Sequence, residues 1–356
     1  MIWKIEKPEN DVNNIPSYAP GTPEREKLLS ELEKLKGRPA EIPLIIGGKE
    51  VKTDNVFEIK CPHRKDVVLG KAHLAGEEAL KFAIENSLDA HEKWANMDWY
   101  HRTAIFRKAA DLLAGQYRTR HIAAIMMNHS KNPYEAEIDL AELVDFWNFN
   151  AYYARQIYEI QPSQYPGESN RTDWRPIEGF VFAVAPFNFY AIGGNLPSAP
   201  AIVGNVALWK PATSVIFSNY KIMKLLIETG LPAGIINFVP FPHKHMDVVL
   251  KHRDFAGLHF TGSYETFATL WESIGKNIRN YKNFPRVVGE TGGKDFIFAH
   301  KSADPRGLAI NIMRGAFEYQ GQKCSAASRA YIPESIWPKV KKIIQEEQPK
   351  IKCGPV

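Results

Sequence analysis

The chain has 356 residues, enough for two domains with a sizeable buried core, and its composition is that of an ordinary globular protein. Its formal net charge of +5 at pH 7 is spread along the sequence without a long basic run, which argues against nucleic-acid binding. Three cysteines without CxxC spacing and eleven histidines without HxxxH spacing argue against a disulfide framework or a metal site. No apolar run approaches the ~20 residues that span a bilayer, so membrane insertion is not expected.

The N-terminal stretch MIWKIEKPENDVNNIP lacks the apolar core of a secretory signal and is too acidic and too poor in Arg for a transit peptide. The sequence alone therefore indicates a protein of the cytosol, or one whose targeting segment was removed or never included. Residues 22–37 are predicted to form a helix, with Thr22 as N-cap and Pro23 in its first turn. The runs IPLIIGGKEV and NVFEIKCP around a Gly-Gly turn are typical of a β-hairpin.

Three longer helices are then predicted from apolar residues that recur at helical spacing, over 77–97, 101–129 and 132–160. Residues 161–176 interrupt this pattern with prolines and polar side chains. They are interpreted either as a linker or as an arm that reaches a neighbouring subunit.

From residue 179 onward, strands and helices alternate. Buried-type strands are predicted at GFVFAVAPF, NVALWKP, GIINFVP and FAGLHFTG, and helices at 214–230, 243–252 and 263–280. The rest of the chain has strands at RVVGETGG, DFIFAH and RAYIP, and helices over 303–321 and 334–347. This alternation predicts an α/β fold with a parallel sheet covered on both faces.

Four unusual stretches follow predicted strands, where parallel sheets bind their ligands: APFNF, KPA, FTGS and GETGGK. A GxGxxG fingerprint is absent. FTGS nevertheless combines a glycine with a serine that opens a helix, so it could bind a pyrophosphate or be a plain helix cap. Lys210, in KPA, could bind a ribose or phosphate, or simply be solvated.

Three side chains in or near these stretches could carry chemistry. Glu290 could be a general base if burial raised its pKa, or a salt-bridged residue at a turn. Asn188 could stabilise an oxyanion or only tie down a loop. Cys324, within EYQGQKCSAASR, could be a thiolate favoured by nearby positive charge, or a small buried thiol. Together, the thiol, amide and carboxylate suit covalent oxidation of an aldehyde.

The ordered motifs PFNF, KPA, FTGS, ETGGK and GQKCS resemble the signature of the aldehyde dehydrogenase superfamily. The segments AEIDLAELVDFWNFNAYYA and FPRVVGETGGKDF look most like the branch that oxidises glutamate γ-semialdehyde to glutamate. The resemblance covers about residue 20 to the end. It implies a Rossmann-type sheet that binds NAD, a second α/β catalytic domain, and assembly into homo-oligomers through residues 161–176. By the same resemblance, eukaryotic members work in the mitochondrial matrix.

The resemblance also implies roles for individual residues. Cys324 would attack the aldehyde carbon, Asn188 and the Cys324 amide would hold the oxyanion, and Glu290 would activate water. The residues implied in contacts with NAD are Ala185, Lys210, Gly262, Ser263, Tyr264, Glu265 and Thr266. The residues implied in shaping the substrate pocket are Glu142, Phe189, Lys323 and Ser325.

The expected organisation follows from these motifs. An N-terminal extension and helix occupy 1–40, the NAD-binding domain 41–160 and 177–288, the arm or linker 161–176, and part of a catalytic domain 289–356. Members of the superfamily continue beyond the corresponding end point, so we expect an exposed apolar sheet edge and low stability in isolation. Two other functions stay open: a non-catalytic chain that binds NAD or regulates a full-length subunit, and an enzyme for another aldehyde.

Overall fold

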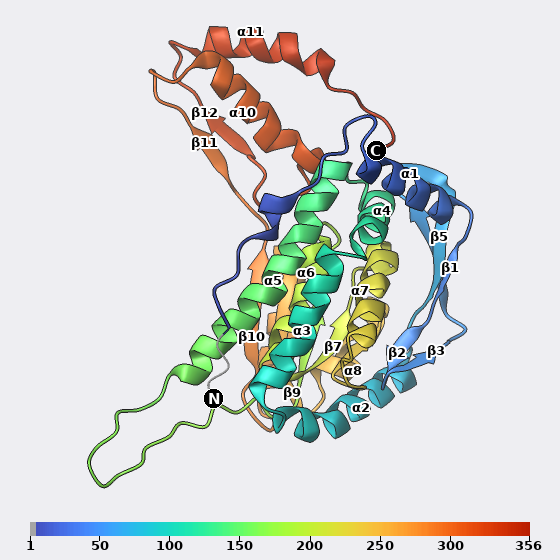
Figure 1. Ribbon diagram of the computed structural model, residues 1–356, viewed down its shortest axis with the longest axis vertical. Coiled ribbons are helices and arrows are strands. Elements are labelled where there is room, and N and C mark those ends of the chain that lie inside the picture. The colour runs from blue at the N-terminus through green and yellow to red at the C-terminus, as the bar shows by residue number, and fades with distance from the viewer. Residues whose placement is uncertain (1–4) are drawn as a thin grey trace.

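A central seven-stranded sheet organises the computed structural model, which describes residues 5–356 (Figure 1). Its strand order is β10-β9-β6-β7-β8-β2-β3. The strands are β2 (Leu44–Ile46), β3 (Lys49–Val51), β6 (Phe180–Val184), β7 (Val206–Lys210), β8 (Ile236–Phe238), β9 (Phe255–Gly262) and β10 (Arg286–Thr291). The five strands from β10 to β8 are parallel, and the β2–β3 hairpin adds an antiparallel edge. The predicted α/β class with a parallel sheet is confirmed.

Helices cover this sheet in layers. In the larger body of the chain they are α1 (Pro23–Lys36), α2 (Glu77–Ala95), α3 (Trp99–Ala114), α4 (Arg118–His129), α5 (Pro133–Glu159), α6 (Tyr190–Ile202), α7 (Ile216–Glu228), α8 (Met246–Leu250) and α9 (Tyr264–Lys276). Helix α6 packs directly on strands β6 and β7, and α3 and α5 pack over α6 as an outer layer (Figure 1). Strands β6 and β7 are buried along their whole length, which explains their continuous apolar runs.

Two helical predictions need correction. The single helix predicted over 101–129 is two helices, α3 and α4, because the backbone at Gly115 leaves the helical region with φ −101° and ψ −110°. Helix α6 was missed, because its glycines and prolines are poor helix formers. Tertiary packing favours glycine at position 194, where a Cβ would lie 2.9 Å from the Leu143 side chain on α5.

The predicted hairpin is partly correct. The Gly47–Gly48 turn joins β2 to β3, as expected. The run NVFEIKCP, however, contains β4 (Val56–Cys61), which pairs with β5 (Arg64–His73). Strand β5 was not predicted from the sequence. With β1 (Ala40–Ile42), these two strands form a separate three-stranded sheet.

The C-terminal part forms a small body of its own, at the upper left of Figure 1. Helices α10 (Pro305–Phe317) and α11 (Trp337–Glu347) pack on the two parallel strands β11 (Phe296–Phe298) and β12 (Arg329–Tyr331). Phe298 on β11 is 77% exposed, and Val288 on the edge strand β10 is 58% exposed. The expected exposed apolar sheet edge is therefore present.

Residues 161–176 contain no strand and project from the end of α5 as a narrow loop (Figure 1). Side chains hold its two arms together, since Gln161 and Gln164 bond the backbone of Thr172 and Asn170 across the loop. Within residues 5–356, no helix combines the length and apolar character needed to cross a membrane.

Candidate active site

A cavity of about 310 Å³ lies at the carboxyl ends of β9 and β10. Helix α5, the start of α6 and the loop after α10 complete its walls, so segments far apart in the sequence meet there. Five of the predicted site residues line it: Glu142, Phe189, Glu290, Cys324 and Ser325. The site therefore lies where ligands bind to open parallel sheets.

Cys324 and Glu290 meet in this cavity. The thiol Sγ lies 3.9 Å from Glu290 Oε1, at the limit of a weak sulfur hydrogen bond. The turn after β10 allows this approach, because a Cβ at Gly293 would lie 1.5 Å from the Cys324 carbonyl oxygen. Only glycine fits there, as the GETGGK motif suggested.

The electrostatics of the thiol differ from the sequence expectation. The pKa of Cys324 is raised above its usual value, first by burial and then by the negative charge of Glu290. The backbone amides of Cys324 and Ser325 oppose this shift. Lys323, expected to favour thiolate and to shape the pocket, instead pairs with Glu318 at 3.3 Å and does not line the cavity.

Glu290 and Asn188 also have surroundings that the sequence did not define. Glu290 is exposed on edge strand β10 rather than buried. Asn188 Nδ2 donates to the Gln322 carbonyl oxygen at 2.8 Å and thus ties the loop after β6 to the Cys324 loop. This bond uses one of the two amide N–H groups and leaves the other.

A second carboxylate, Glu142 on α5, faces the same cavity. Burial and the nearby charge of Asp139 raise its pKa from 4.5 to about 7, while Lys131 opposes the shift. The cavity thus combines one exposed carboxylate, Glu290, with one that is largely withdrawn from water. Such a pair of unlike carboxyl groups is a common feature of catalytic sites.

The predicted cofactor residues lie along the same edge of the sheet. Lys210, at the end of β7, is 8% exposed, and burial lowers its pKa, so the solvated-lysine reading is wrong. The amide of Ala185, at the end of β6, donates to the Lys210 carbonyl oxygen at 3.1 Å. Lys210 Nζ lies 5.5 Å from the centre of the Phe241 ring.

The FTGS turn joins β9 to α9. Ser263 Oγ accepts from the Thr266 amide at 3.3 Å and caps the helix. Gly262 ends the strand, and Tyr264 opens the helix with 63% of its surface exposed. Glu265 and Thr266 line a second cavity, of about 380 Å³, which lies between α9 and the segment that contains α8.

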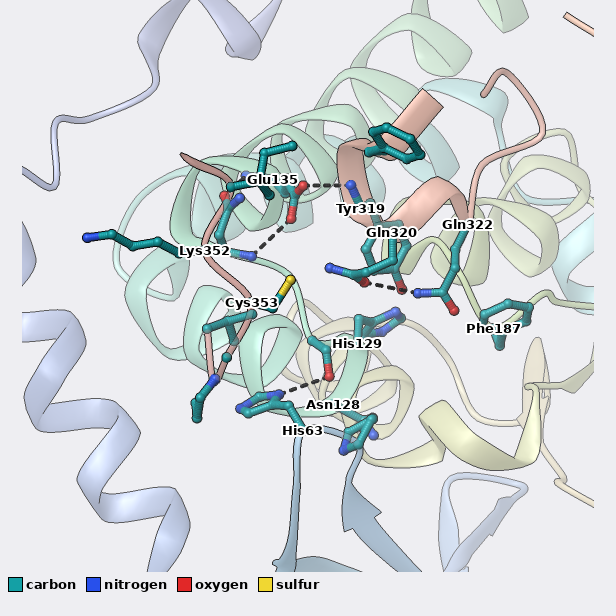
Figure 2. Close-up of a pocket in the computed structure, with 18 of the residues that line it drawn as sticks. His63, Asn128, His129, Glu135, Phe187, Tyr319, Gln320, Gln322, Lys352 and Cys353 are labelled. Atoms are coloured by element: carbon teal, nitrogen blue, oxygen red, sulfur yellow. Dashed lines mark hydrogen bonds between the residues drawn. The ribbon is translucent and has the colours of Figure 1, made fainter. Parts of the chain in front are cut away.

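A larger cavity, of about 1190 Å³, lies between the start of α5, the β4–β5 turn and residues 351–356 (Figure 2). None of the predicted site residues lines it, although Phe187 of the PFNF motif does. It does share Tyr319, Gln320 and Gln322 with the segment that leads to Cys324. Within residues 5–356, no cluster of three His, Cys, Asp or Glu side chains is placed to hold a metal ion.

The sequence analysis missed several residues that support the site. His259 on β9 lines the cavity, and its Nδ1 lies 2.9 Å from the Leu196 carbonyl oxygen. Lys131 and Asp139 form a buried ion pair behind Phe189. Charged residues within the apolar 132–160 pattern were the available signal for Asp139, whereas nothing in the sequence distinguishes Lys131.

Comparison with known proteins identifies the class. Residues 50–356 match the model of the aldehyde dehydrogenase family, and the chain belongs to that family. It is 47% identical over 350 residues to delta-1-pyrroline-5-carboxylate dehydrogenase of Agaricus bisporus, covering 97% of this chain and 64% of that protein. It is 43% identical over 340 residues to the mitochondrial enzyme of the same name from Homo sapiens, and the match covers 95% of this chain and 60% of that protein.

Solved structures agree with this relationship. The delta-pyrroline-5-carboxylate dehydrogenase from Mycobacterium tuberculosis, bound with NAD, superposes with a TM-score of 0.97 at 44% identity. The match covers 100% of this chain and 66% of that one. This chain therefore spans less than two thirds of the length of these relatives.

Proposed function

We propose that this chain oxidises glutamate γ-semialdehyde, the open form of pyrroline-5-carboxylate, to glutamate with NAD as hydride acceptor. The observation that carries the proposal is the approach of Cys324 Sγ to Glu290 Oε1, 3.9 Å, in a cavity at the carboxyl edge of the sheet. A thiol beside a carboxylate is what a covalent oxidation followed by hydrolysis needs. The choice of aldehyde rests on the relatives named above.

In the first step, the thiolate of Cys324 adds to the aldehyde carbon, forming a C–S bond and an oxyanion. The Cys324 amide and the remaining N–H of Asn188 are the available donors for that oxygen. Because burial and Glu290 raise the thiol pKa, the thiol gives its proton to a water molecule that carries it to solvent, and Glu290 is left to act as the base in the later hydrolysis.

The strand ends offer the groups that an NAD molecule needs. The amides at the start of α9, next to Gly262 and Ser263, suit a pyrophosphate. Lys210 is a largely buried cation at the same edge and suits a ribose or phosphate oxygen. NAD, when bound, accepts the hydride that leaves the former aldehyde carbon.

Hydrolysis completes the proposed reaction. Glu290 takes a proton from a water molecule, the water oxygen bonds to the thioacyl carbon, and the C–S bond breaks to regenerate the Cys324 thiolate. Aldehyde, water and NAD⁺ become carboxylate, NADH and two protons. The exposure of Glu290 suits this step, because water reaches it directly.

A second candidate is a chain that binds NAD without turnover. The exposure of β10 favours it, because this strand carries Glu290 and leaves one side of the cavity uncovered by other residues of the described chain. We further propose homo-oligomers formed through residues 161–176 and a location in the mitochondrial matrix. The projecting loop and the mitochondrial relatives support these two proposals.

The test is NADH formation by purified protein given NAD⁺ and pyrroline-5-carboxylate, with Cys324→Ser as control and propionaldehyde as a competing substrate. We expect turnover that Cys324→Ser abolishes while NAD binding, measured by calorimetry, is retained. NAD binding without turnover in the wild type would favour the non-catalytic chain. Faster oxidation of propionaldehyde would contradict the assigned substrate.

A further inference from the structure

A buried cation sits behind the candidate active site. Lys131, in the turn between α4 and α5, is 1% exposed, and its Nζ lies 2.7 Å from Asp139 Oδ2. The same Nζ lies 4.2 Å from the centre of the Phe189 ring and 4.3 Å from that of Tyr319. One cation thus contacts two aromatic rings, which meet edge to face with 6.5 Å between their centres.

The two rings belong to the two segments that carry the proposed chemistry. Phe189 follows Asn188 directly and lines the cavity. Tyr319 lies in the short 3₁₀ segment Glu318–Gly321 that leads to Cys324. Asp139 reinforces the first segment, because its carboxylate accepts from the amides at the start of α6, Tyr190 and Ala191, each at 2.9 Å.

The second segment is strained and depends on outside contacts. Tyr319 and Gln320 have φ values of 51° and 53°, a left-handed conformation that is costly for residues other than glycine. The Tyr319 amide donates to Glu135 Oε1 at 2.8 Å (Figure 2). Glu135 Oε2 accepts from the Asn132 amide at the start of α5. The turn before Cys324 is therefore held by a carboxylate and by a ring against Lys131.

From these contacts we infer that Lys131 is a positioning residue for the nucleophile. By attracting both rings and the Asp139 carboxylate, it keeps the Cys324 loop against the Asn188 loop and so sets the place of the thiol. The effect on turnover rests on the proposed function. The effect on the thiol itself does not.

Alkylation of Cys324 tests the inference without turnover. Iodoacetamide labelling is followed by mass spectrometry in a Cys353→Ser background, with free cysteine in the same solution as reference. In Lys131→Met the loop is released and the thiol becomes more accessible, so the relative rate rises about fivefold or more. Lys131→Arg keeps a cation beside the rings and restores most of the wild-type rate.

Arg118→Met is the matched control, because Arg118 also pairs with a buried carboxylate of α5, Glu137, but contacts neither ring. It leaves the relative rate unchanged. If Lys131→Met does not fold, Tyr319→Leu removes one ring, keeps the ion pair and makes the same comparison. A wild-type labelling rate in Lys131→Met, with a melting temperature lowered as in Arg118→Met, would show that Lys131 is only structural.

The two proposals fail in different ways. A wild-type chain that forms no NADH contradicts the proposed function, and the labelling comparison still decides the role of Lys131. Where turnover is present, we expect Lys131→Met to lower kcat about tenfold or more with a smaller change in KM, because a displaced nucleophile affects the chemical step.

Discussion

At the scale of residues, Glu142 and Glu290 face one cavity in unlike surroundings. Glu142 is withdrawn from water beside Asp139, whereas Glu290 stands exposed on an edge strand. The Glu142 carboxyl therefore holds its proton to near neutral pH, whereas Glu290 is open to water. Sequence reasoning could find both residues but not this difference, which arises from packing.

The raised pKa of Glu142 predicts a pH-dependent stability. A carboxyl whose folded pKa lies above its unfolded value stabilises the fold fully below about pH 4.5 and loses that contribution as pH rises through about 7. Between pH 5 and pH 8 the free energy of unfolding of the wild type should thus fall by about 1–3 kcal/mol more than that of Glu142→Gln. Urea unfolding at both pH values measures this, and parallel pH profiles would contradict it.

Loss of the Glu290 carboxylate is predicted to have two opposite effects, one on alkylation of the thiol and one on turnover. Its charge raises the pKa of Cys324, so Glu290→Gln should lower that pKa and speed alkylation of Cys324 at pH 7 about two- to fivefold. The same variant should slow NADH formation about a hundredfold, because the base is lost. Slower alkylation together with slower turnover would mean that Glu290 favours the thiolate instead.

At the scale of elements, the turn after β10 sets how closely the two halves of the site meet. Gly293→Ala would place a Cβ inside the Cys324 backbone, so the loop must move and turnover should fall at least about tenfold. Gly275→Ala in α9 meets no atom within 4 Å and should stabilise the protein by about 0.5–1 kcal/mol. The rate of NADH formation and the melting temperature are measured for both variants. Equal changes in the two variants would contradict the claim that Gly293 is packed against Cys324.

Elements with strong local signals could be predicted from sequence. The Asp304 side chain caps α10 by accepting from the Gly307 amide, and Pro133 opens α5, both as their residue types indicate. Helix α6 was missed, since its sequence YAIGGNLPSAPAI forms a helix only under tertiary packing. The break at Gly115 was missed although a glycine followed by the mostly polar run QYRTRH is a helix-stop signal in the sequence.

At the scale of the whole molecule, ordered motifs predicted the sheet edge at which the candidate residues meet. The resemblance implied roles for Cys324, Glu290, Glu142, Phe189 and Ser325, and the fold brings these five residues to one cavity. The motifs did not predict the contacts of Lys131, because its partners Asp139, Phe189 and Tyr319 come from three separate segments and only the fold brings them together. The position of Lys323 outside the cavity has a local cause, because it pairs with Glu318 across a turn that contains the left-handed residues Tyr319 and Gln320.

A covalent intermediate on Cys324 is the most informative observation for this molecule. In Glu290→Gln, which should hydrolyse the thioacyl group slowly, mass spectrometry after mixing with NAD⁺ and pyrroline-5-carboxylate should find Cys324 heavier by the aldehyde less two hydrogens. The adduct should require NAD⁺ and disappear in Cys324→Ser. NADH formed without that adduct, or an adduct on Cys61 or Cys353 instead, would contradict the assignment of Cys324 as the nucleophile.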